Sequence, residues 1–387
     1  MILPALIIAP HFEFPTMNGG DIYIEQIAQH LSAEIGRVTL LGCSEIVDYS
    51  QGSLVQRKKY DNKMRSKSAA ALRTILLQDH YYAQKFLTPA FSKTAQDLID
   101  SNPGSQLFFS YLVTTNILTN AKNSPKPVVI TQNDERVWFE NQAKHSNNPL
   151  QKWVSHLSAK WVTRFFRQKS QGFVFAHITK EDMQGYQALG QHRGFVLPAG
   201  VEVLPLPTMA KWDGTIRLLF CGSLGVKMNF DALQHFEGNY WPQIKAKFKD
   251  TVVDTVAGSN PSSQVRNLCT RNGWQLQPNL ASEQLLALHH TSTFAILPFP
   301  YTTGAKIKLL NAYAAGLPVL ATTNMRFGEK QDFYPNLYSN APDEWVRRLE
   351  QISTEGISSP DKERCQDFAS QYSWPAIIQS MLKELDQ

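Results

Sequence analysis

The sequence predicts an α/β protein made of two consecutive units, each built on a parallel sheet that helices cover on both faces. The chain has 387 residues, more than one compact core usually holds, because domains of ~100–200 residues are typical. Short apolar runs alternate with segments of helical periodicity in both halves. This alternation is typical of buried parallel strands joined by helices. Residues 203–214, which include two prolines, separate the halves and are the expected linker.

The first half opens with an apolar run at Leu3–Ala9, which predicts a strand. Turn residues follow at Pro15–Gly20, and Asp21–Ala33 then carries apolar residues at helical spacing. We therefore expect a strand, a glycine-containing loop and a helix in this order. The other strands of this half are expected at Val38–Cys43, Leu107–Ser110, Pro127–Thr131, Gly172–Ala176 and Gly194–Leu197.

The second half repeats the arrangement. Its strands are expected at Gly214–Gly222, Thr251–Gly258, Phe294–Pro298 and Pro318–Thr322. Helices are expected at Asn229–Lys247 and Lys306–Ala315, and an amphipathic helix at Trp374–Leu385. Open parallel sheets bind their ligands at the carboxyl ends of the strands, so the loops at these ends are the places to search for a site.

Composition and absent motifs exclude several classes of protein. Hydrophobic residues make up 43% and charged residues 18%, which is ordinary for a soluble globular chain. The four cysteines lie far apart without a CxxC pair, so neither a zinc site nor a thioredoxin-type motif is indicated. P-loop, GxGxxG, HExxH and GxSxG motifs are also absent. No apolar run reaches the ~18–20 residues that cross a bilayer, and the first run lacks the features of a signal peptide, so a cytoplasmic protein is expected.

Positive charge is concentrated in the first half. The net charge is +5, yet residues 1–200 hold 21 Lys and Arg against 15 Asp and Glu, and residues 201–387 hold 17 against 18. This imbalance indicates an acidic partner for the first half, such as a membrane surface, a phosphorylated substrate or nucleic acid. No nucleic-acid-binding motif supports the last of these, so no nucleic acid is expected as a partner.

Two segments supply most of these cations. Residues 56–73 hold seven basic residues against one acid, and residues 152–169 hold five against none. In the second segment, Trp153, Leu157, Trp161 and Phe165 recur every four residues on one helical stripe. A basic amphipathic helix with aromatic residues fits a peripheral contact with an anionic membrane. A core helix with a solvated basic face is the alternative for 152–169, and an exposed segment is expected at 56–73.

Glycine-containing loops at expected strand ends are the candidate phosphate sites. Asn18–Asp21 lies between the first strand and the first helix, where glycines allow close approach and a helix N-terminus offers N–H donors. Gly222–Lys227 follows the first strand of the second half, and Ala257–Ser259 ends the next strand. A tight turn that caps the helix is the alternative for the first loop, and a loop with a solvated lysine is the alternative for the second.

The segment Leu297–Thr322 carries the strongest signal. A strand ends in a loop of proline and aromatic residues, and Gly304 then opens a helix that carries Lys306 and Lys308. Cationic side chains at a helix N-terminus suit a nucleotide phosphate. An ordinary crossover helix, with its small residues used for packing, is the alternative.

At residues 304–322, the run GAKIKLLNAYAAGLPVLAT resembles the donor-site signature of GT-B glycosyltransferases of family 4. Other segments resemble further parts of these enzymes in the same order: PTMNGGDIYIEQIAQHLS, TQNDERVWFENQAK, LPAGVEV, IRLLFCGSLGVKMNFDAL, DTVAGS and FASQYSWPAIIQSMLKEL. The resemblance thus runs over almost the whole chain. It implies a GT-B fold with an N-terminal Rossmann-like acceptor domain (1–202), a Rossmann-like nucleotide-sugar donor domain (203–365) and a C-terminal helical segment (366–387) that packs back on the first domain.

The resemblance also implies an activity. The protein would be a retaining, metal-independent transferase that moves a sugar from a nucleotide-diphosphate sugar to a lipid-linked or glycan acceptor, without a cofactor. The implied catalytic residues are Lys227, Lys308 and Asp134. The implied donor-binding residues are Gly19, Gly20, Gly222, Ser223, Gly258, Thr303, Gly304, Ala305, Lys306 and Asn311, and the acceptor-side residues are His11, Gln132, Asn133 and Glu135. No metal ligand is implied, so lysines and helix N-termini would stabilise the leaving diphosphate.

Three positions depart from the family pattern. Thr303 and Asn311 stand where relatives carry two carboxylates, and Gln132 stands where they carry a histidine. An amide at Asn311 can still accept a hydrogen bond from ribose, but without charge assistance. Two alternatives therefore stay open: a catalytically weakened homologue that serves as a binding partner or scaffold, and a GT-B nucleotide-sugar epimerase.

Overall fold

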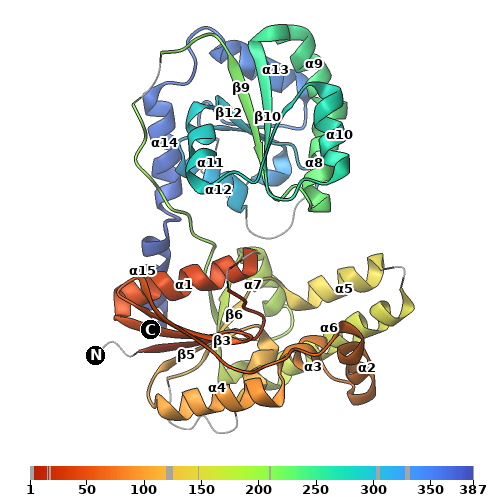
Figure 1. Cartoon of the computed structure of the whole chain (residues 1–387), viewed down its shortest axis with the longest axis vertical. Helices are drawn as coiled ribbons and strands as arrows, with labels where there is room; N and C mark the ends of the chain where they lie inside the picture. Colours follow the sequence, from red (N-terminus) through yellow and green to blue (C-terminus); the bar gives the residue numbers. More distant parts are fainter. Residues whose placement is uncertain are drawn as a thin grey trace. The chain divides into compact units, whose positions relative to one another are not determined.

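The structure is a computed structural model that describes residues 4–14, 16, 19–118, 125–146, 148–208, 211–301, 306–326 and 332–386. It divides into two compact units, shown in Figure 1. Unit 1 comprises residues 1–199 and 374–387, and unit 2 comprises residues 200–373. Each unit is an α/β layer structure on its own sheet, so the predicted fold class is confirmed.

Unit 1 has an eight-stranded sheet in the order β4-β3-β2-β1-β5-β6-β7-β8. The strands are β1 (Ala5–Ile8), β2 (Arg37–Leu41), β3 (Glu45–Ser50), β4 (Ser53–Lys59), β5 (Gln106–Ser110), β6 (Val128–Thr131), β7 (Val174–His177) and β8 (Arg193–Val196). In this spatial order, every neighbouring pair from β2 through β1, β5, β6 and β7 to β8 is parallel. The central strands β1 and β6 are buried along their full length, as apolar runs in a covered parallel sheet should be.

The hairpin β3–β4 is the part of this sheet that differs from the sequence prediction. It pairs antiparallel with β2 and extends the sheet edge. Its turn places Gln51 and Gly52 at positive φ. The whole of β4 is exposed, so it has none of the buried apolar residues on which the prediction relied.

The helices of unit 1 are α1 (Gly19–Ile35), α2 (Lys67–Leu77), α3 (Tyr81–Phe86), α4 (Pro89–Ser101), α5 (Glu135–His145), α6 (Pro149–Lys169), α7 (Lys180–Gln187) and α15 (Trp374–Leu385), with the 3-10 turns η1 (Leu112–Ile117) and η2 (Ser170–Gly172). Figure 1 shows α1 and α4 on opposite faces of the sheet. The Trp374 ring of α15 stacks on His30 of α1, with ring centroids 5.9 Å apart. Unit 1 is therefore completed by a helix that follows unit 2 in the sequence.

The predicted stripe on α6 is only partly an outer surface. Trp153 is exposed, whereas Phe165 is buried and stacks on Trp161 at 5.0 Å between ring centroids. The C-terminal part of this stripe therefore belongs to the core, as the alternative interpretation held. The predicted exposed segment 56–73 divides between β4 and α2.

Unit 2 has a six-stranded parallel sheet in the order β11-β10-β9-β12-β13-β14. Its strands are β9 (Ile216–Cys221), β10 (Val252–Gly258), β11 (Gln275–Pro278), β12 (Phe294–Leu297), β13 (Val319–Ala321) and β14 (Leu337–Tyr338). Its helices are α8 (Lys227–Asn239), α9 (Trp241–Phe248), α10 (Ser263–Asn272), α11 (Ser282–Thr291), α12 (Ile307–Ala314), α13 (Pro342–Ile352) and α14 (Ser359–Ser370), with η3 (Lys249–Thr251) and η4 (Thr323–Met325). They pack on both sides of the sheet (Figure 1).

Large aromatic side chains fill the core of unit 2. Trp345 of α13 is fully buried, lies 4.2 Å from the Tyr240 ring between centroids, and donates its indole N–H to the Ser339 carbonyl at 2.9 Å. The polar end of a buried tryptophan is thereby satisfied. Among the described residues, no helix is long and apolar enough to cross a membrane.

Close backbone contact defines the ends of β9 and β10. The Gly222 N–H donates to the Ala257 carbonyl at 3.1 Å. Gly258 has φ +152°, and a Cβ atom at this position would overlap the carbonyl oxygen of Gly222. The glycine is therefore required by the space between two strand ends.

We predict that Gly258→Ala lowers the free energy of unfolding by about 2 kcal/mol or more, because the new methyl group has to displace backbone. Gly238→Ala is the matched control, since Gly238 lies in α8 with no atom within 4 Å of the new methyl group. That control should be neutral or stabilise the helix by up to about 1 kcal/mol. Urea unfolding followed by circular dichroism measures both, and equal stability of the two variants would contradict the steric account.

Candidate functional site

Polar side chains meet at the carboxyl ends of β1, β5 and β6 in unit 1. His11 Nε2 lies 3.0 Å from Gln132 Nε2, and the Tyr111 hydroxyl donates to Gln132 Oε1 at 3.3 Å. The His11 and Tyr111 rings meet edge to face, 4.7 Å apart between centroids. Gln132 Nε2 also donates to the Ser110 hydroxyl at 3.2 Å. Two predicted acceptor-side residues, His11 and Gln132, thus lie together, and Asn133 is half-buried next to Gln132.

His11 is suited to hydrogen bonding as a neutral ring. Burial lowers its pKa to about 3. Since the Gln132 amide donates to Nε2, the ring proton belongs on Nδ1. An Asp21 carboxylate oxygen lies 3.7 Å from the same Nε2 atom. His11 can therefore accept a hydrogen bond, but at neutral pH it does not hold an added proton.

Asp134, a predicted catalytic residue, begins α5 as its N-cap. Its carboxylate accepts the Val137 N–H at 3.1 Å and an Arg136 N–H at 3.3 Å. Its own backbone N–H donates to Asp182 at 2.8 Å. These contacts give Asp134 a defined structural task, because a cap residue satisfies free N–H groups of a helix. A catalytic role for it stays a prediction.

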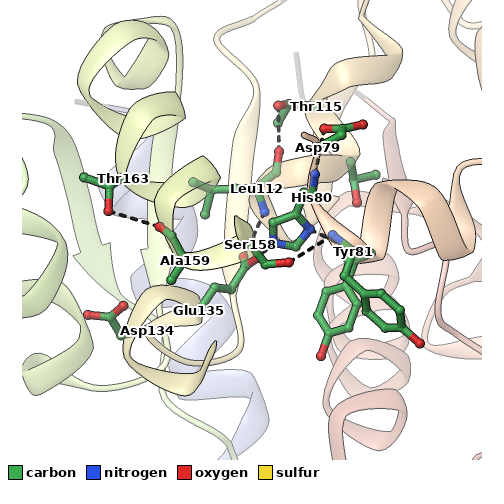
Figure 2. A network of polar contacts seen from close by, with 12 residues as sticks. Asp79, His80, Tyr81, Leu112, Thr115, Asp134, Glu135, Ser158, Ala159 and Thr163 are labelled. Atoms are coloured by element: carbon green, nitrogen blue, oxygen red, sulfur yellow. Dashed lines mark hydrogen bonds and ion pairs between the residues drawn. The ribbon is translucent and has the colours of Figure 1, made fainter. Parts of the chain in front are cut away.

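Glu135 is buried inside unit 1, beside Leu112, the residue that follows Tyr111 (Figure 2). One of its carboxylate oxygens accepts the Leu112 N–H at 3.0 Å, and the other lies 3.9 Å from His80 Nε2. Burial raises the pKa of Glu135 to about 8, and the nearby Asp134 charge adds to the increase. The side chain is 1% exposed. This predicted acceptor-side residue is therefore buried. It contacts the backbone N–H that follows Tyr111, one of the residues that lie together with His11 and Gln132.

His80 is the partner that the sequence interpretation missed. It is fully buried and N-caps α3, because its Nδ1 accepts the Tyr82 N–H at 3.1 Å. The ring proton therefore belongs on Nε2, the nitrogen that points toward Glu135 in Figure 2. Burial lowers the pKa of His80 to about 3, so the ring stays neutral. His80 and Glu135 lie far apart in the sequence and belong to no motif, so no local pattern signals this contact.

The Tyr111 backbone is strained at this point. Tyr111 has φ 67°, which a residue with a side chain rarely adopts. The next N–H, that of Leu112, is the group that Glu135 holds. Strained backbone of this kind persists where the surroundings fix it, and it concentrates at functional sites. Glu135 and His80 thus support the conformation that brings Tyr111 against His11 and Gln132.

In unit 2, Lys308 packs against the glycine at the end of β9. An ideal Cβ at Gly222 would lie 2.8 Å from Lys308 Cε and 3.1 Å from Asn229 Nδ2. The Lys308 ammonium lies 5.6 Å from the centre of the Phe299 ring. Burial lowers the Lys308 pKa. In the described part of the chain, Lys308 has no ion-pair partner, so it is a cation available to an anionic ligand at the strand ends.

Asn229, also unpredicted, holds the loop after β9. It is buried, and its amide donates to the Ser223 carbonyl at 2.7 Å. Ser223 Oγ in turn lies 3.4 Å from Ser259 Oγ, next to Gly258. The predicted donor residues Gly222, Ser223 and Gly258 therefore come together at the ends of β9 and β10, and Lys308 packs on Gly222.

Lys227 begins α8 and is 82% exposed in its side chain. Its ammonium is held by both oxygens of Asp231, at 2.8 and 2.7 Å. The Tyr301 hydroxyl donates to the same carboxylate. Asp231 was not predicted, although a lysine and an aspartate four residues apart on a helix are a recognisable pair. Asp231 thus orients Lys227, the first residue predicted to bind the phosphate.

The remaining predicted donor residues are less defined. Lys306 is the N-cap residue of α12, and Asn311 is exposed on the same helix. Thr303, Gly304 and Ala305 lie outside the described residues. In unit 1, Gly19 and Gly20 form the first residues of α1. Among the described residues, no three His, Cys, Asp or Glu side chains are grouped so that they could hold a metal ion.

The buried Glu135 predicts a pH dependence of stability. Its folded-state pKa is raised, so the folded state keeps a proton that the unfolded state releases as pH rises above about 4.5. The contribution of Glu135 to the free energy of unfolding is fully present below that pH and is lost as pH rises toward 8. Glu135→Gln should therefore become more stable relative to the unaltered protein between pH 5 and pH 8, by at least about 1 kcal/mol.

Urea unfolding at four pH values in this range measures the difference. Glu140→Gln serves as the control, because Glu140 lies on the same helix and its side chain is 51% exposed. Its stability should follow the unaltered protein at every pH. A constant difference between Glu135→Gln and the unaltered protein would show that Glu135 is ionised in the folded state throughout.

Comparison with known proteins agrees with this architecture. The family model described as "Glycosyl transferases group 1" matches residues 215–354, which lie in unit 2 and make up less than half of the chain. No curated protein matches the sequence.

Solved structures share the fold over most or nearly all of the chain. Anabaena HepE in complex with UDP and glucose is 12% identical, with TM-score 0.56 and 99% coverage of both chains. The N-terminal domain of Candida albicans trehalose-6-phosphate phosphatase is 10% identical, with TM-score 0.61 and coverage of 99% of this chain and 96% of that one. A mutant of S. aureus TarM is 9% identical with TM-score 0.51, and the match covers 77% of this chain and 59% of that one, less than two thirds of its length. The predicted GT-B fold is confirmed, whereas membership of family 4 stays a prediction.

Proposed function

We propose that the protein is a glycosyltransferase that binds a nucleotide-diphosphate sugar in unit 2 and transfers the sugar to a lipid-linked or glycan acceptor bound by unit 1. The observation that carries the proposal is the Lys308 side chain, which packs on Gly222 at the ends of the central strands of unit 2. The glycosyl transferases group 1 model matches the same region. HepE, a structure with the same fold, is in complex with UDP and glucose.

Unit 2 offers the chemistry that a diphosphate needs. Lys308 and Lys227 are cations near the Gly222–Lys227 loop, and α8 begins at the end of this loop with free N–H groups. Donors fixed before the reaction stabilise the negative charge that develops on a leaving diphosphate. In this proposal Asp231 keeps Lys227 oriented until the diphosphate arrives and competes for its ammonium.

The reaction exchanges one bond at the anomeric carbon. The bond from this carbon to the diphosphate oxygen breaks, and a bond to an acceptor hydroxyl oxygen forms on the same face, so the configuration is retained. The hydroxyl proton passes to the leaving diphosphate, which Lys308 and Lys227 stabilise without a metal ion. His11, Gln132 and Tyr111 of unit 1 would orient the acceptor through hydrogen bonds, because the Nε2 atom of the neutral His11 ring can accept from an acceptor hydroxyl in place of the Gln132 amide.

Lys308→Met tests the donor site. We expect affinity for UDP to fall about tenfold or more, because a charge-assisted contact with phosphate contributes roughly 1.5–3 kcal/mol. Stability should be unchanged or slightly increased, since the variant removes a cation that burial disfavours. Calorimetric titration with UDP-, GDP- and dTDP-sugars measures the affinities. Lys245→Met, an exposed lysine of α9, is the control and should bind normally. Absence of binding to every nucleotide sugar would sink the proposal in favour of a scaffold role.

Asn311→Glu tests the ribose contact that the family pattern implies. If this exposed side chain of α12 faces ribose, a carboxylate should tighten UDP binding severalfold, because charge-assisted hydrogen bonds are roughly twice as strong as neutral ones. Asn311→Gln has the same length without the charge and should not tighten binding. Equal affinities of the two variants would remove Asn311 from the donor site.

A further inference from the structure

Helix α2 of unit 1 has an inverted distribution of apolar residues. Its large side chains Leu72, Leu76 and Leu77 are 58%, 70% and 55% exposed. The residues that it buries are the small Ala70 and Thr74. An amphipathic helix of a globular protein normally turns its large apolar residues inward, and a contiguous exposed group of them marks an interaction site. The outer face of α2 thus has the character of a contact surface.

Cations outnumber acids around this face. Residues 61–79 contain Lys63, Lys67 and two arginines, and the two acids of this range, Asp61 and Asp79, stand at its ends, where Asp79 accepts hydrogen bonds from the His80 N–H and the Gln84 amide. The arginines are held within unit 1, since Arg65 donates to the Gln84 carbonyl at 2.6 Å and Arg73 to the Gln84 side chain at 2.9 Å. In the described part of the chain, Lys63 and Lys67 form no ion pair and are exposed. The leucines of α2 are therefore bordered by two exposed lysines, Lys67 at the first residue of the helix and Lys63 in the segment before it.

The start of α6, a helix that contacts α2, repeats this combination. Leu150 and Trp153 are about half exposed, and the exposed Lys152 lies between them in the sequence. Figure 1 shows α2, α5 and α6 grouped at one end of unit 1. Exposed leucine and tryptophan interleaved with lysine are typical of segments that lie in the interface of a bilayer.

We propose that α2, with the first turns of α6, docks on the surface of an anionic lipid bilayer, with Leu72 and Leu76 entering the headgroup region and Lys63 and Lys67 contacting lipid phosphates. A second copy of the chain is a poorer occupant, because a two-fold contact would bring the two sets of lysines together with fewer acids than cations beside them. The inference concerns unit 1 alone and does not depend on the donor chemistry of unit 2.

Vesicle sedimentation of the full chain tests this surface. Vesicles of phosphatidylcholine with 30% phosphatidylglycerol should pellet the protein at least tenfold more strongly than vesicles of phosphatidylcholine alone, and 0.5 M salt should weaken the binding. The double variant Leu72→Gln and Leu76→Gln should lose at least tenfold in affinity for the anionic vesicles. Lys63→Gln with Lys67→Gln should lose severalfold and reduce the salt dependence.

A matched control uses exposed apolar residues outside the proposed surface. Leu54→Gln with Val55→Thr alters the exposed edge strand β4 and should bind vesicles like the unaltered protein. All variants should keep the same UDP affinity and the same stability in urea, so that a failed membrane inference is distinguishable from a failed donor site or a misfolded variant.

Three outcomes would overturn the proposal. Vesicle binding that is unchanged by the leucine variant would show that α2 does not enter the bilayer. Equal binding to neutral and anionic vesicles would remove the role of the lysines. A dimer in analytical ultracentrifugation that the leucine variant dissociates would assign the α2 face to a second copy of the chain.

Discussion

The parallel register of neighbouring strands is the constraint on which both candidate sites depend. In unit 1, Ile8 of β1 lies opposite Phe109 of β5, and Ser110 lies opposite Ile130 of β6. The residues that follow these strands are therefore delivered to one edge of the sheet. His11, Tyr111 and Gln132 reach each other because three apolar runs pair in this register and not because they are close in the sequence.

The same constraint acts in unit 2 with different residues. There the ends of β9 and β10 approach so closely that glycine is required at position 258, and the lysine of a later helix packs over the glycine at position 222. Unit 1 thus places neutral, half-buried polar groups at the carboxyl ends of its strands, whereas unit 2 places cations beside backbone. Neutral polar groups suit the acceptor hydroxyl that the proposed function assigns to unit 1. Cations suit the diphosphate that it assigns to unit 2.

Much of the fold could be predicted because buried parallel strands leave a clear trace in the sequence. Runs such as those that became β1, β6 and β12 are mainly apolar and buried throughout, and they were placed within a few residues. The β3–β4 hairpin was missed because β4 is exposed on all its residues and carries polar side chains. Inside β3, buried and half-buried residues alternate, but the first buried residue is Glu45 and the next, half-buried one is Ile46, so the sequence shows the alternation only over residues 47–50.

The site was less predictable than the fold, for two different reasons. Asp231 follows Lys227 by one helical turn, so attention to pairs on a helix would have found it. His80 meets Glu135 only through the tertiary packing of α3 and α5, and no sequence pattern near either residue predicts the contact. Residues whose contacts are local are open to sequence reasoning, whereas residues that meet across the fold require the structure.

The placement of α15 has a consequence for how the chain is made. Unit 1 is discontinuous, because its last helix is synthesised only after the whole of unit 2. Until then the faces of Tyr23 and His30 that meet Trp374 are uncovered. Unit 2, whose sheet and core are continuous in the sequence, can complete its folding first. Unit 1, which makes up the N-terminal half of the chain, can therefore complete its folding only after α15 has been translated.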